Sequence, residues 1–159
     1  ADPKKIAIYG GSYGGYAALT GATYAPDLFC WAVAVYGISN LITFMITIPP
    51  YWITENKALF VKRIGDPETE EEFLKSRSPF FYVDRIKIPL LIIQGANDPR
   101  VKRSESEQIV EALKNKGIEH EYILFPDEGH SIVRPENRMK FYSAAEKFLA
   151  KHLGGRFEE

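Results

Sequence analysis

Cysteine is nearly absent from the sequence, which has a single one, Cys30, among 159 residues. One thiol cannot form an internal disulfide, so an apolar core must hold the chain together. Cys30 lies within the apolar run FCWAVAVYG, where we expect it to be buried and unreactive. A reducing, cytoplasmic location is the expectation that follows. No cysteines or histidines have zinc-binding spacing, and we expect neither a metal nor another cofactor.

An excess of one charge is also missing, because 20 lysines and arginines face 21 aspartates and glutamates. A chain with a net charge of −1 has no electrostatic reason to bind nucleic acid or an anionic membrane surface. No apolar run is long enough to span a bilayer. With 45% hydrophobic and 26% charged residues, the composition is that of a folded globular protein, and we expect residues 1–159 to form a single domain.

Short apolar runs alternate with helical patterns along the chain. Each run is bounded by glycine or proline and has the length of a strand buried on both faces of a sheet. Segments with helical spacing separate the runs, which is typical of strands joined by crossover helices. The sequence therefore predicts an α/β fold with a mostly parallel sheet and helices on both faces. The four predicted strands are Lys5–Gly10, Phe29–Gly37, Pro89–Gly95 and Glu119–Pro126.

Local signals predict where two of the helices begin. Ser104 and Glu107 have the spacing of a capping box, and Gly117 is placed to end the helix that they would begin. Asp66, followed by Pro67, predicts the start of a short acidic helix.

A long insertion, Ile38–Tyr82, separates the second and third predicted strands. It is rich in apolar and aromatic side chains, which belong either to the core or to the roof of a pocket. Trp52 is among them and is a candidate for contact with substrate. The side chains in question are Phe44, Met45, Tyr51, Trp52 and Phe60.

The strongest chemical signal is the segment IAIYGGSYGGY, in which a serine stands among four glycines. Ser12 with Gly10 and Gly14 satisfies the pattern G-x-S-x-G, directly after a predicted strand and before a predicted helix. Such a turn lifts the hydroxyl above the sheet edge in a strained conformation, and the two flanking glycines avoid a collision of strand and helix. The amide of Tyr13 would then point towards a developing oxyanion. The alternative is a phosphate-binding turn, but no lysine follows before Pro26.

A serine hydroxyl becomes a good nucleophile only beside a base, and the chain has three histidines. His120 begins a predicted strand and His152 lies in the last turn of the last predicted helix, where a solvated surface position or a role at the helix dipole is the better interpretation. His130 follows the fourth predicted strand in a loop, at the same carboxyl edge of the sheet as Ser12. His130 is therefore the predicted base.

The acid that orients His130 should follow another strand. Asp98, in the segment QGANDPRV, comes directly after the third predicted strand, although capping of a local turn is an alternative role. The chain order Ser12, Asp98, His130 is that of nucleophile, acid and base in α/β-hydrolases. Asp127 and Glu128 are rival acids, but they stand so close before His130 that we expect them to shape its loop.

Three segments together resemble the carboxyl-terminal catalytic region of the prolyl oligopeptidase family of serine peptidases, in particular its branch of acylaminoacyl peptidases and dipeptidyl peptidases. The resemblance runs from Asp2 to about Gly155 and implies part of an α/β-hydrolase fold. The segments are DPKKIAIYGGSYGGYAAL, QGANDPRV and LFPDEGHSIVRPENRMKFYSAAEKFLAKHL.

The resemblance implies a role for each candidate residue. Ser12 would be the nucleophile, His130 the general base and acid, and Asp98 the residue that orients His130. The amide of Tyr13 would donate one hydrogen bond to the oxyanion. Arg100 would anchor a substrate carbonyl or carboxylate, or form a surface salt bridge instead.

The resemblance also implies segments that this chain does not contain. In the family, earlier strands of the usual eight precede the nucleophile, an amino-terminal β-propeller is usual, and a tyrosine hydroxyl from an earlier segment is the second oxyanion donor. We expect the chain to be part of a larger enzyme, with the strand Lys5–Gly10 unpaired on one side. An unpaired edge is a template for pairing, so we expect association through it, most simply as a two-fold homodimer.

The predicted function is that of a serine peptidase acting on peptide or acyl-peptide substrates by acyl transfer. The same residues would serve a carboxylesterase, because esters demand less transition-state stabilisation than peptide amides. A third hypothesis is a catalytically impaired fragment that needs a partner chain, since one oxyanion donor would be missing.

Overall fold

The computed structural model describes residues 2 and 4–157, with the side chains of all of these except 50 and 53–57. All strand pairs of its single four-stranded sheet are parallel. The predicted α/β fold and its four strands are confirmed. In spatial order the strands are β1 (Ala7–Gly11), β2 (Trp31–Val35), β3 (Leu90–Gly95) and β4 (His120–Phe125).

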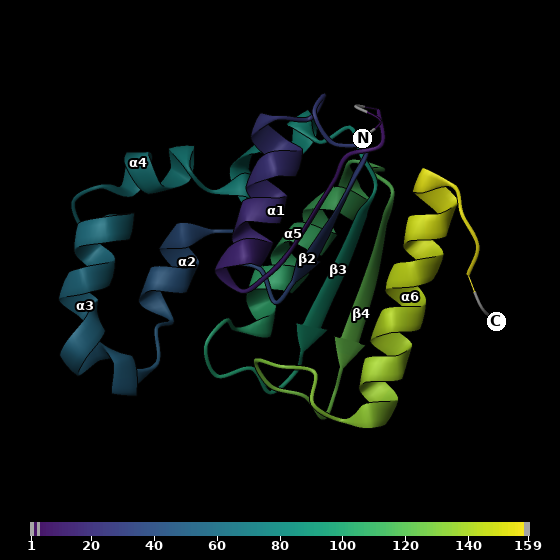
Figure 1. Cartoon of the computed structure of the whole chain (residues 1–159). Coiled ribbons are helices and arrows are strands. Elements are labelled where there is room, and N and C mark those ends of the chain that lie inside the picture. Colours follow the sequence, from purple (N-terminus) through teal and green to yellow (C-terminus); the bar gives the residue numbers. More distant parts are fainter. Residues whose placement is uncertain (1, 3, 158–159) are drawn as a thin grey trace.

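Helices cover both faces of the sheet (Figure 1). One face of β2 and β3 packs against α1 (Tyr13–Tyr24), α5 (Arg103–Asn115) and the 3-10 helix η1 (Pro79–Arg85). The opposite face packs against α6 (Pro135–Leu153). Every residue of β2 and β3 is buried, as their apolar runs predicted. In the described part of the chain, no helix combines the length and the apolar character needed to cross a membrane.

The insertion between β2 and β3 folds into three α-helices beside the sheet, which come before η1 in the chain (Figure 1). They are α2 (Leu41–Ile46), α3 (Pro50–Ile64) and α4 (Glu71–Ser76). The sequence did not predict α2 or α3, because the pair Pro49-Pro50 reads as a break in a helical pattern. A proline at the first position of a helix is well tolerated, since its missing N–H would have no partner there.

The aromatic and apolar side chains of the insertion divide between the two interpretations. Phe44 and Met45 are buried in a third core cluster, so the core interpretation is confirmed for them. Trp52 and Phe60 are half-buried at its margin and stack with ring centroids 5.6 Å apart. Tyr51 is 60% exposed and therefore does not belong to the core.

The capping box predicted for α5 is wrong. The helix begins at Arg103, one residue before Ser104, and no side chain caps its first turn. Glu107 instead forms an ion pair with Arg103 at 3.4 Å. The end of the helix is confirmed, because Gly117 has a φ of 66° just beyond the last turn.

The predicted start of the short acidic helix is also wrong. The carboxylate of Asp66 accepts a hydrogen bond from the amide of Glu68 at 2.9 Å, and the amide of Glu70 donates to the carbonyl of Asp66 at 2.7 Å. These bonds close a separate turn, and α4 begins only at Glu71. The capping residue is real, but it caps a turn that does not continue into the helix.

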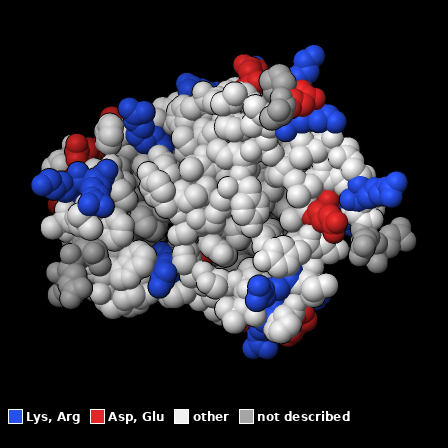
Figure 2. Space-filling view, viewed as in Figure 1, with Lys and Arg blue, Asp and Glu red and all other residues white. Residues whose placement is uncertain are grey.

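The first strand, β1, lies at the edge of the sheet, and its outer side has no partner among the described residues. The prediction that this strand is buried on both faces is wrong, since Tyr9 is 57% exposed. The prediction that Cys30 is buried is also wrong, since this residue beside β1 is half-buried, and its thiol donates to the carbonyl of Ile6 at 3.2 Å. In Figure 2 none of the described charged side chains covers the centre of the face over α1. A groove there is lined by Ile8, Tyr13, Tyr16, Tyr24, Leu28 and Phe29, among others.

Association through the edge of β1 stays a prediction. One chain has a mass of 18.1 kDa. At micromolar concentration, light scattering on the 159-residue chain should give twice this mass. Tyr9→Lys, which adds a charge to this edge, should shift the mass towards that of one chain. A mass of 18.1 kDa for the unmodified chain would contradict the prediction.

Candidate active site

The turn between β1 and α1 holds Ser12 in a strained backbone conformation, with φ of 58° and ψ of −119°. The amide of Ser12 donates to the carbonyl of Val35 at 2.9 Å, which ties the turn to β2. Its hydroxyl makes no capping bond to α1. A non-glycine residue in this region of φ and ψ is strained, as the G-x-S-x-G pattern predicted.

Close backbone contacts account for two of the glycines around Ser12. A Cβ on Gly10 would lie 2.3 Å from the carbonyl oxygen of Gly14, and a Cβ on Gly15 would lie 2.7 Å from the Cα of Gly37. A Cβ on Gly14 would meet nothing within 4 Å. The predicted collision of strand and helix is therefore confirmed at Gly10 and wrong at Gly14. A Cβ on Gly10 would meet the backbone of Gly14, whereas a Cβ on Gly14 would point into open space.

This geometry predicts opposite results for two Gly→Ala variants. Gly10→Ala should lower the free energy of unfolding by about 2–3 kcal/mol, because its Cβ overlaps backbone atoms that cannot move without displacing Ser12. Gly14→Ala should be neutral or stabilise by up to about 1 kcal/mol, since alanine favours a helix over glycine. Urea unfolding measures both, and equal destabilisation by the two variants would contradict the proposed contact.

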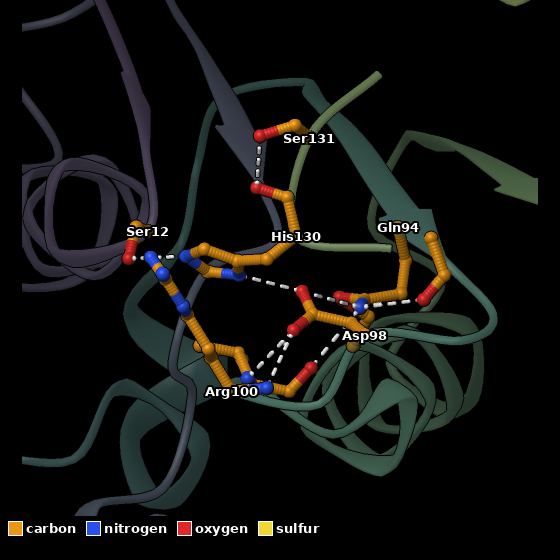
Figure 3. Close-up of polar contacts among 9 residues, drawn as sticks. Ser12, Gln94, Asp98, Arg100, His130 and Ser131 are labelled. Atoms are coloured by element: carbon orange, nitrogen blue, oxygen red, sulfur yellow. Dashed lines mark hydrogen bonds and ion pairs between the residues drawn. The ribbon is translucent and has the colours of Figure 1, made fainter. Parts of the chain in front are cut away.

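The structure brings Ser12, His130 and Asp98 together at the carboxyl edge of the sheet (Figure 3). Nε2 of His130 lies 2.8 Å from Oγ of Ser12, and Nδ1 of His130 lies 2.7 Å from Oδ2 of Asp98. The three residues follow three different strands. Because the carboxyl ends of parallel strands meet at one edge of the sheet, the three side chains converge there. A continuous line of hydrogen bonds therefore joins the three predicted residues in the predicted order.

Asp98 uses its two carboxylate oxygens for different contacts. Its side chain has no exposed surface. Oδ1 accepts hydrogen bonds from the amides of Arg100 at 2.8 Å and Val101 at 3.0 Å, while Oδ2 faces His130. The turn-capping role and the His130 contact, which were alternatives in the sequence, are thus made by the same side chain.

Glu128 holds the loop that carries His130. The carboxylate is buried and accepts hydrogen bonds from the amides of Val133 at 3.0 Å and Arg134 at 2.8 Å, and from Nδ2 of Asn137 at 2.9 Å. Burial raises the pKa of this carboxyl group, but the hydrogen bonds outweigh burial, so its pKa lies below the ordinary value. Glu128 shapes the loop, as predicted.

The other candidate acid and bases make contacts elsewhere. Asp127 forms an ion pair with Arg134 at 3.0 Å and accepts a hydrogen bond from Nδ2 of Asn137 at 2.9 Å, so it also holds the loop, as predicted. Nδ1 of His120 lies 2.7 Å from the carbonyl oxygen of Ile118. The solvated surface position predicted for His152 is wrong, because its side chain is only 13% exposed and packs against an aromatic ring one turn earlier on α6. The alternative, a role at the helix dipole, stays a prediction, since His152 lies in the last turn of α6.

Tyr36 forms a wall beside the imidazole of His130. Its ring centroid lies 4.8 Å from that of His130. Its φ of 40° is unusual for an aromatic residue, and its amide donates to the carbonyl of Ile93 at 2.6 Å. Burial raises the pKa of the Tyr36 hydroxyl, and the nearby Asp98 adds to the effect. The sequence gives no sign of the strained backbone of Tyr36 or of its contact with His130.

The amide of Tyr13 is the first N–H of α1, so it has no partner within the helix, and no acceptor outside the helix bonds it among the described residues. It lies at the positive end of the helix dipole, next to the Ser12 hydroxyl. This is the position that the sequence predicted for an oxyanion donor.

Arg100 has an exposed side chain that extends towards Ser12 in Figure 3. Its guanidinium carbon lies 5.7 Å from the centre of the Trp52 ring, within the range of a cation–π contact. No carboxylate of a described side chain forms a salt bridge with Arg100. The described residues also contain no group of three metal-ligating side chains arranged to hold an ion.

Comparison with known proteins extends these observations. The family model described as the prolyl oligopeptidase family matches residues 1–156. The chain belongs to the prolyl oligopeptidase family. The resemblance noted in the sequence is thereby confirmed, and relatives with names from both expected branches are similar to it.

These relatives of the prolyl oligopeptidase family are much longer than this chain. Dipeptidyl aminopeptidase BIII of Pseudoxanthomonas mexicana is 54% identical over 156 residues, which are 97% of this chain and 22% of that protein. Dipeptidyl peptidase family member 6 of Caenorhabditis elegans is 47% identical over 98% of this chain and 21% of its own length. The chain therefore spans about a fifth of the length of these relatives.

Solved structures of two peptidases share the fold. A puromycin-hydrolyzing peptidase of Mycobacterium tuberculosis is 31% identical with a TM-score of 0.90, over 98% of this chain and 23% of that one. The acylaminoacyl peptidase of Pyrococcus horikoshii is also 31% identical, with a TM-score of 0.85, over 100% of this chain and 25% of that one. Both structures therefore contain a region that superimposes on nearly all of this chain.

Proposed function

We propose that the protein is a serine peptidase that transfers the acyl group of a peptide or acyl-peptide to Ser12 and then to water. The observation that carries this proposal is the hydrogen-bonded line from Oγ of Ser12 through His130 to Asp98, with distances of 2.8 and 2.7 Å. Similar proteins named dipeptidyl aminopeptidase and acylamino-acid-releasing enzyme support the substrate class.

The geometry gives each group a step in the reaction. Oδ2 of Asp98 accepts the hydrogen bond of Nδ1–H, so Nε2 of His130 is the basic nitrogen. Nε2 takes the proton of Ser12 as Oγ forms a bond to the substrate carbonyl carbon, and the amide of Tyr13 donates to the resulting oxyanion. His130 then protonates the leaving amine. A water molecule, deprotonated by His130, releases the acyl group and restores Ser12.

Arg100 is proposed to bind a carbonyl or carboxylate of the substrate, with its guanidinium supported by the Trp52 ring. Arg100→Gln should raise KM about tenfold with little change in kcat, because it removes a charge-assisted hydrogen bond made equally in the ground state and the transition state. Trp52→Leu should act in the same direction with a smaller effect. Steady-state kinetics test both, with Arg138→Gln on the exposed surface of α6 as the control. A fall in kcat at unchanged KM would contradict the binding role.

A carboxylesterase is the second candidate, favoured by the identification of one oxyanion donor, the amide of Tyr13. Loss of one such donor typically lowers rates by about 10²–10³, which amide hydrolysis tolerates less well than ester hydrolysis.

A third candidate is an impaired catalytic region that needs a partner chain. The 159-residue chain should be tested with a dipeptidyl p-nitroanilide, an N-acylaminoacyl p-nitroanilide and a p-nitrophenyl ester. Hydrolysis of either anilide would support the peptidase. Hydrolysis of the ester alone would support the esterase, and no turnover by the folded chain would support the impaired region.

A cytoplasmic location is part of the same proposal. Its support is the single thiol, Cys30, which fits a reducing compartment where disulfides do not form. Cell fractionation tests it, and recovery of the native protein in a secreted or membrane fraction would contradict it.

A further inference from the structure

Gln94 is a fully buried polar residue in the apolar strand β3, which reads LLIIQG. A buried carboxamide destabilises a protein unless its donors and its acceptor are satisfied. Here both polar atoms of the side chain have partners. Apolar residues fill the other positions of β3 up to its final glycine, so the polar group at this position calls for a specific explanation.

The amide of Gln94 ties together the two ends of the loop that carries Asp98. Its Nε2 lies 3.0 Å from the carbonyl oxygen of Gly95, where the loop begins, and 3.2 Å from that of Val101, where it ends. The same nitrogen lies 3.5 Å from Oδ2 of Asp98, the oxygen that faces His130 (Figure 3). The loop is therefore wrapped around the end of the Gln94 side chain.

Ser106, on the first turn of α5, keeps the carboxamide pointing this way. Its hydroxyl is buried and donates to Oε1 of Gln94 at 2.9 Å. A reversed carboxamide would direct its oxygen at three other acceptors, the carbonyls of Gly95 and Val101 and the carboxylate of Asp98. The surroundings thus allow one orientation, with the NH₂ group towards Asp98.

We propose that Gln94, oriented by Ser106, is a positioning residue for Asp98. It closes the loop through the carbonyls of Gly95 and Val101 and keeps its NH₂ group 3.5 Å from Oδ2, so the carboxylate stays aligned with Nδ1. This inference rests on the proposed function, because alignment of Asp98 affects a reaction only where His130 acts as the base. A positioning role predicts an effect on reactivity, whereas a merely structural role predicts an effect on stability alone.

The test compares Gln94→Met and Ser106→Ala with Ser78→Ala. Ser78 is an equally buried serine whose hydroxyl bonds Leu41 and Leu74 in the insertion. Three quantities are measured on each 159-residue variant: the thermal midpoint, the maximal rate at which a fluorophosphonate modifies Ser12, and the NMR resonance of the His130 Nδ1 proton. Loss of that resonance in His130→Gln identifies it.

Gln94→Met should lower the maximal rate of modification about tenfold at unchanged probe affinity, and move the Nδ1 proton to higher field as its bond to Asp98 weakens. Ser106→Ala should show the same changes to a smaller extent, and it decides the question where Gln94→Met does not fold. Ser78→Ala should lower the thermal midpoint without changing rate or resonance. Wild-type rate and resonance in a folded Gln94→Met or Ser106→Ala variant would overturn the inference. An unmodified Ser12 in the wild type would instead overturn the proposed function, while the resonance would still test Gln94.

Discussion

Asp98→Asn should lower kcat/KM about 10⁴-fold in a chain that still folds. Oδ1 of Asp98 accepts hydrogen bonds from two backbone amides, those of Arg100 and Val101, so an asparagine keeps its oxygen there and turns its NH₂ group to His130. Nδ1 of His130 must then accept a hydrogen bond, and the ring proton moves to Nε2. A protonated Nε2 cannot take the proton of Ser12, so the nucleophile is not activated.

The matched control for this prediction is Asp127→Asn, the same change at the rival acid. Asp127 is exposed and pairs with Arg134 on the surface, so kcat/KM should stay within about threefold of the wild-type value. Both variants are measured with the fastest substrate of the panel, after circular dichroism shows that they fold. The reverse result, with activity lost in Asp127→Asn and kept in Asp98→Asn, would give the role of the acid to Asp127.

Glu128→Gln should lower the free energy of unfolding at neutral pH by about 2–3 kcal/mol and activity by about tenfold. Both carboxylate oxygens of Glu128 accept hydrogen bonds, Oε2 from Val133 and Oε1 from Arg134 and Asn137. A carboxamide must therefore turn its NH₂ group towards at least one N–H donor, which leaves a buried donor without an acceptor. The loop between β4 and α6 then loses its anchor, and His130 on that loop is held less well. Urea unfolding and steady-state kinetics measure the two effects.

The stability difference should also depend on pH, because the pKa of Glu128 is lower in the folded protein than its ordinary value. A carboxyl group with a lowered pKa stabilises the fold fully above its ordinary pKa, and this stabilisation is lost as the pH falls through the lowered value. The difference between wild type and Glu128→Gln should thus be full at neutral pH and smaller at an acidic pH below the ordinary pKa of a glutamate. Glu146→Gln, an exposed change in the middle of α6, should alter stability by no more than about 0.5 kcal/mol. A difference that is the same at both pH values would contradict the role of the Glu128 carboxylate.

The strands could be predicted because their composition follows from their surroundings. β2 and β3 lie between two layers of helices, so every side chain of β2 is apolar, and those of β3 are apolar as far as Gln94 and the final Gly95. β1 (AIYGG) also begins with apolar residues, and yet it lies at the edge of the described sheet. An apolar run therefore predicts that a strand exists, but it does not say how much of that strand other elements cover.

The three residues of the candidate site could be predicted because each follows a predicted strand at the same edge of the sheet. Their chemistry is also visible in the residue types, a serine among glycines, a carboxylate and a histidine in loops. Gln94 and Tyr36 could not be placed in this way. The role of Gln94 depends on a loop that folds back over it, and that of Tyr36 on a rare backbone conformation. A glutamine within an apolar strand was the one available signal, and it indicates a buried polar contact without naming the partner.

Labelling of the 159-residue chain with a fluorophosphonate probe, followed by mass mapping, tests the central claim most directly. Such a probe modifies a serine whose hydroxyl is activated by a base and whose neighbours stabilise a tetrahedral oxyanion. We predict modification at Ser12, its loss in Ser12→Ala, and a rate about 10⁴-fold lower in Asp98→Asn. A chain that is folded but unmodified at Ser12, or modified at another residue and equally so in Ser12→Ala, would contradict the claim that Ser12, His130 and Asp98 form a working nucleophilic site.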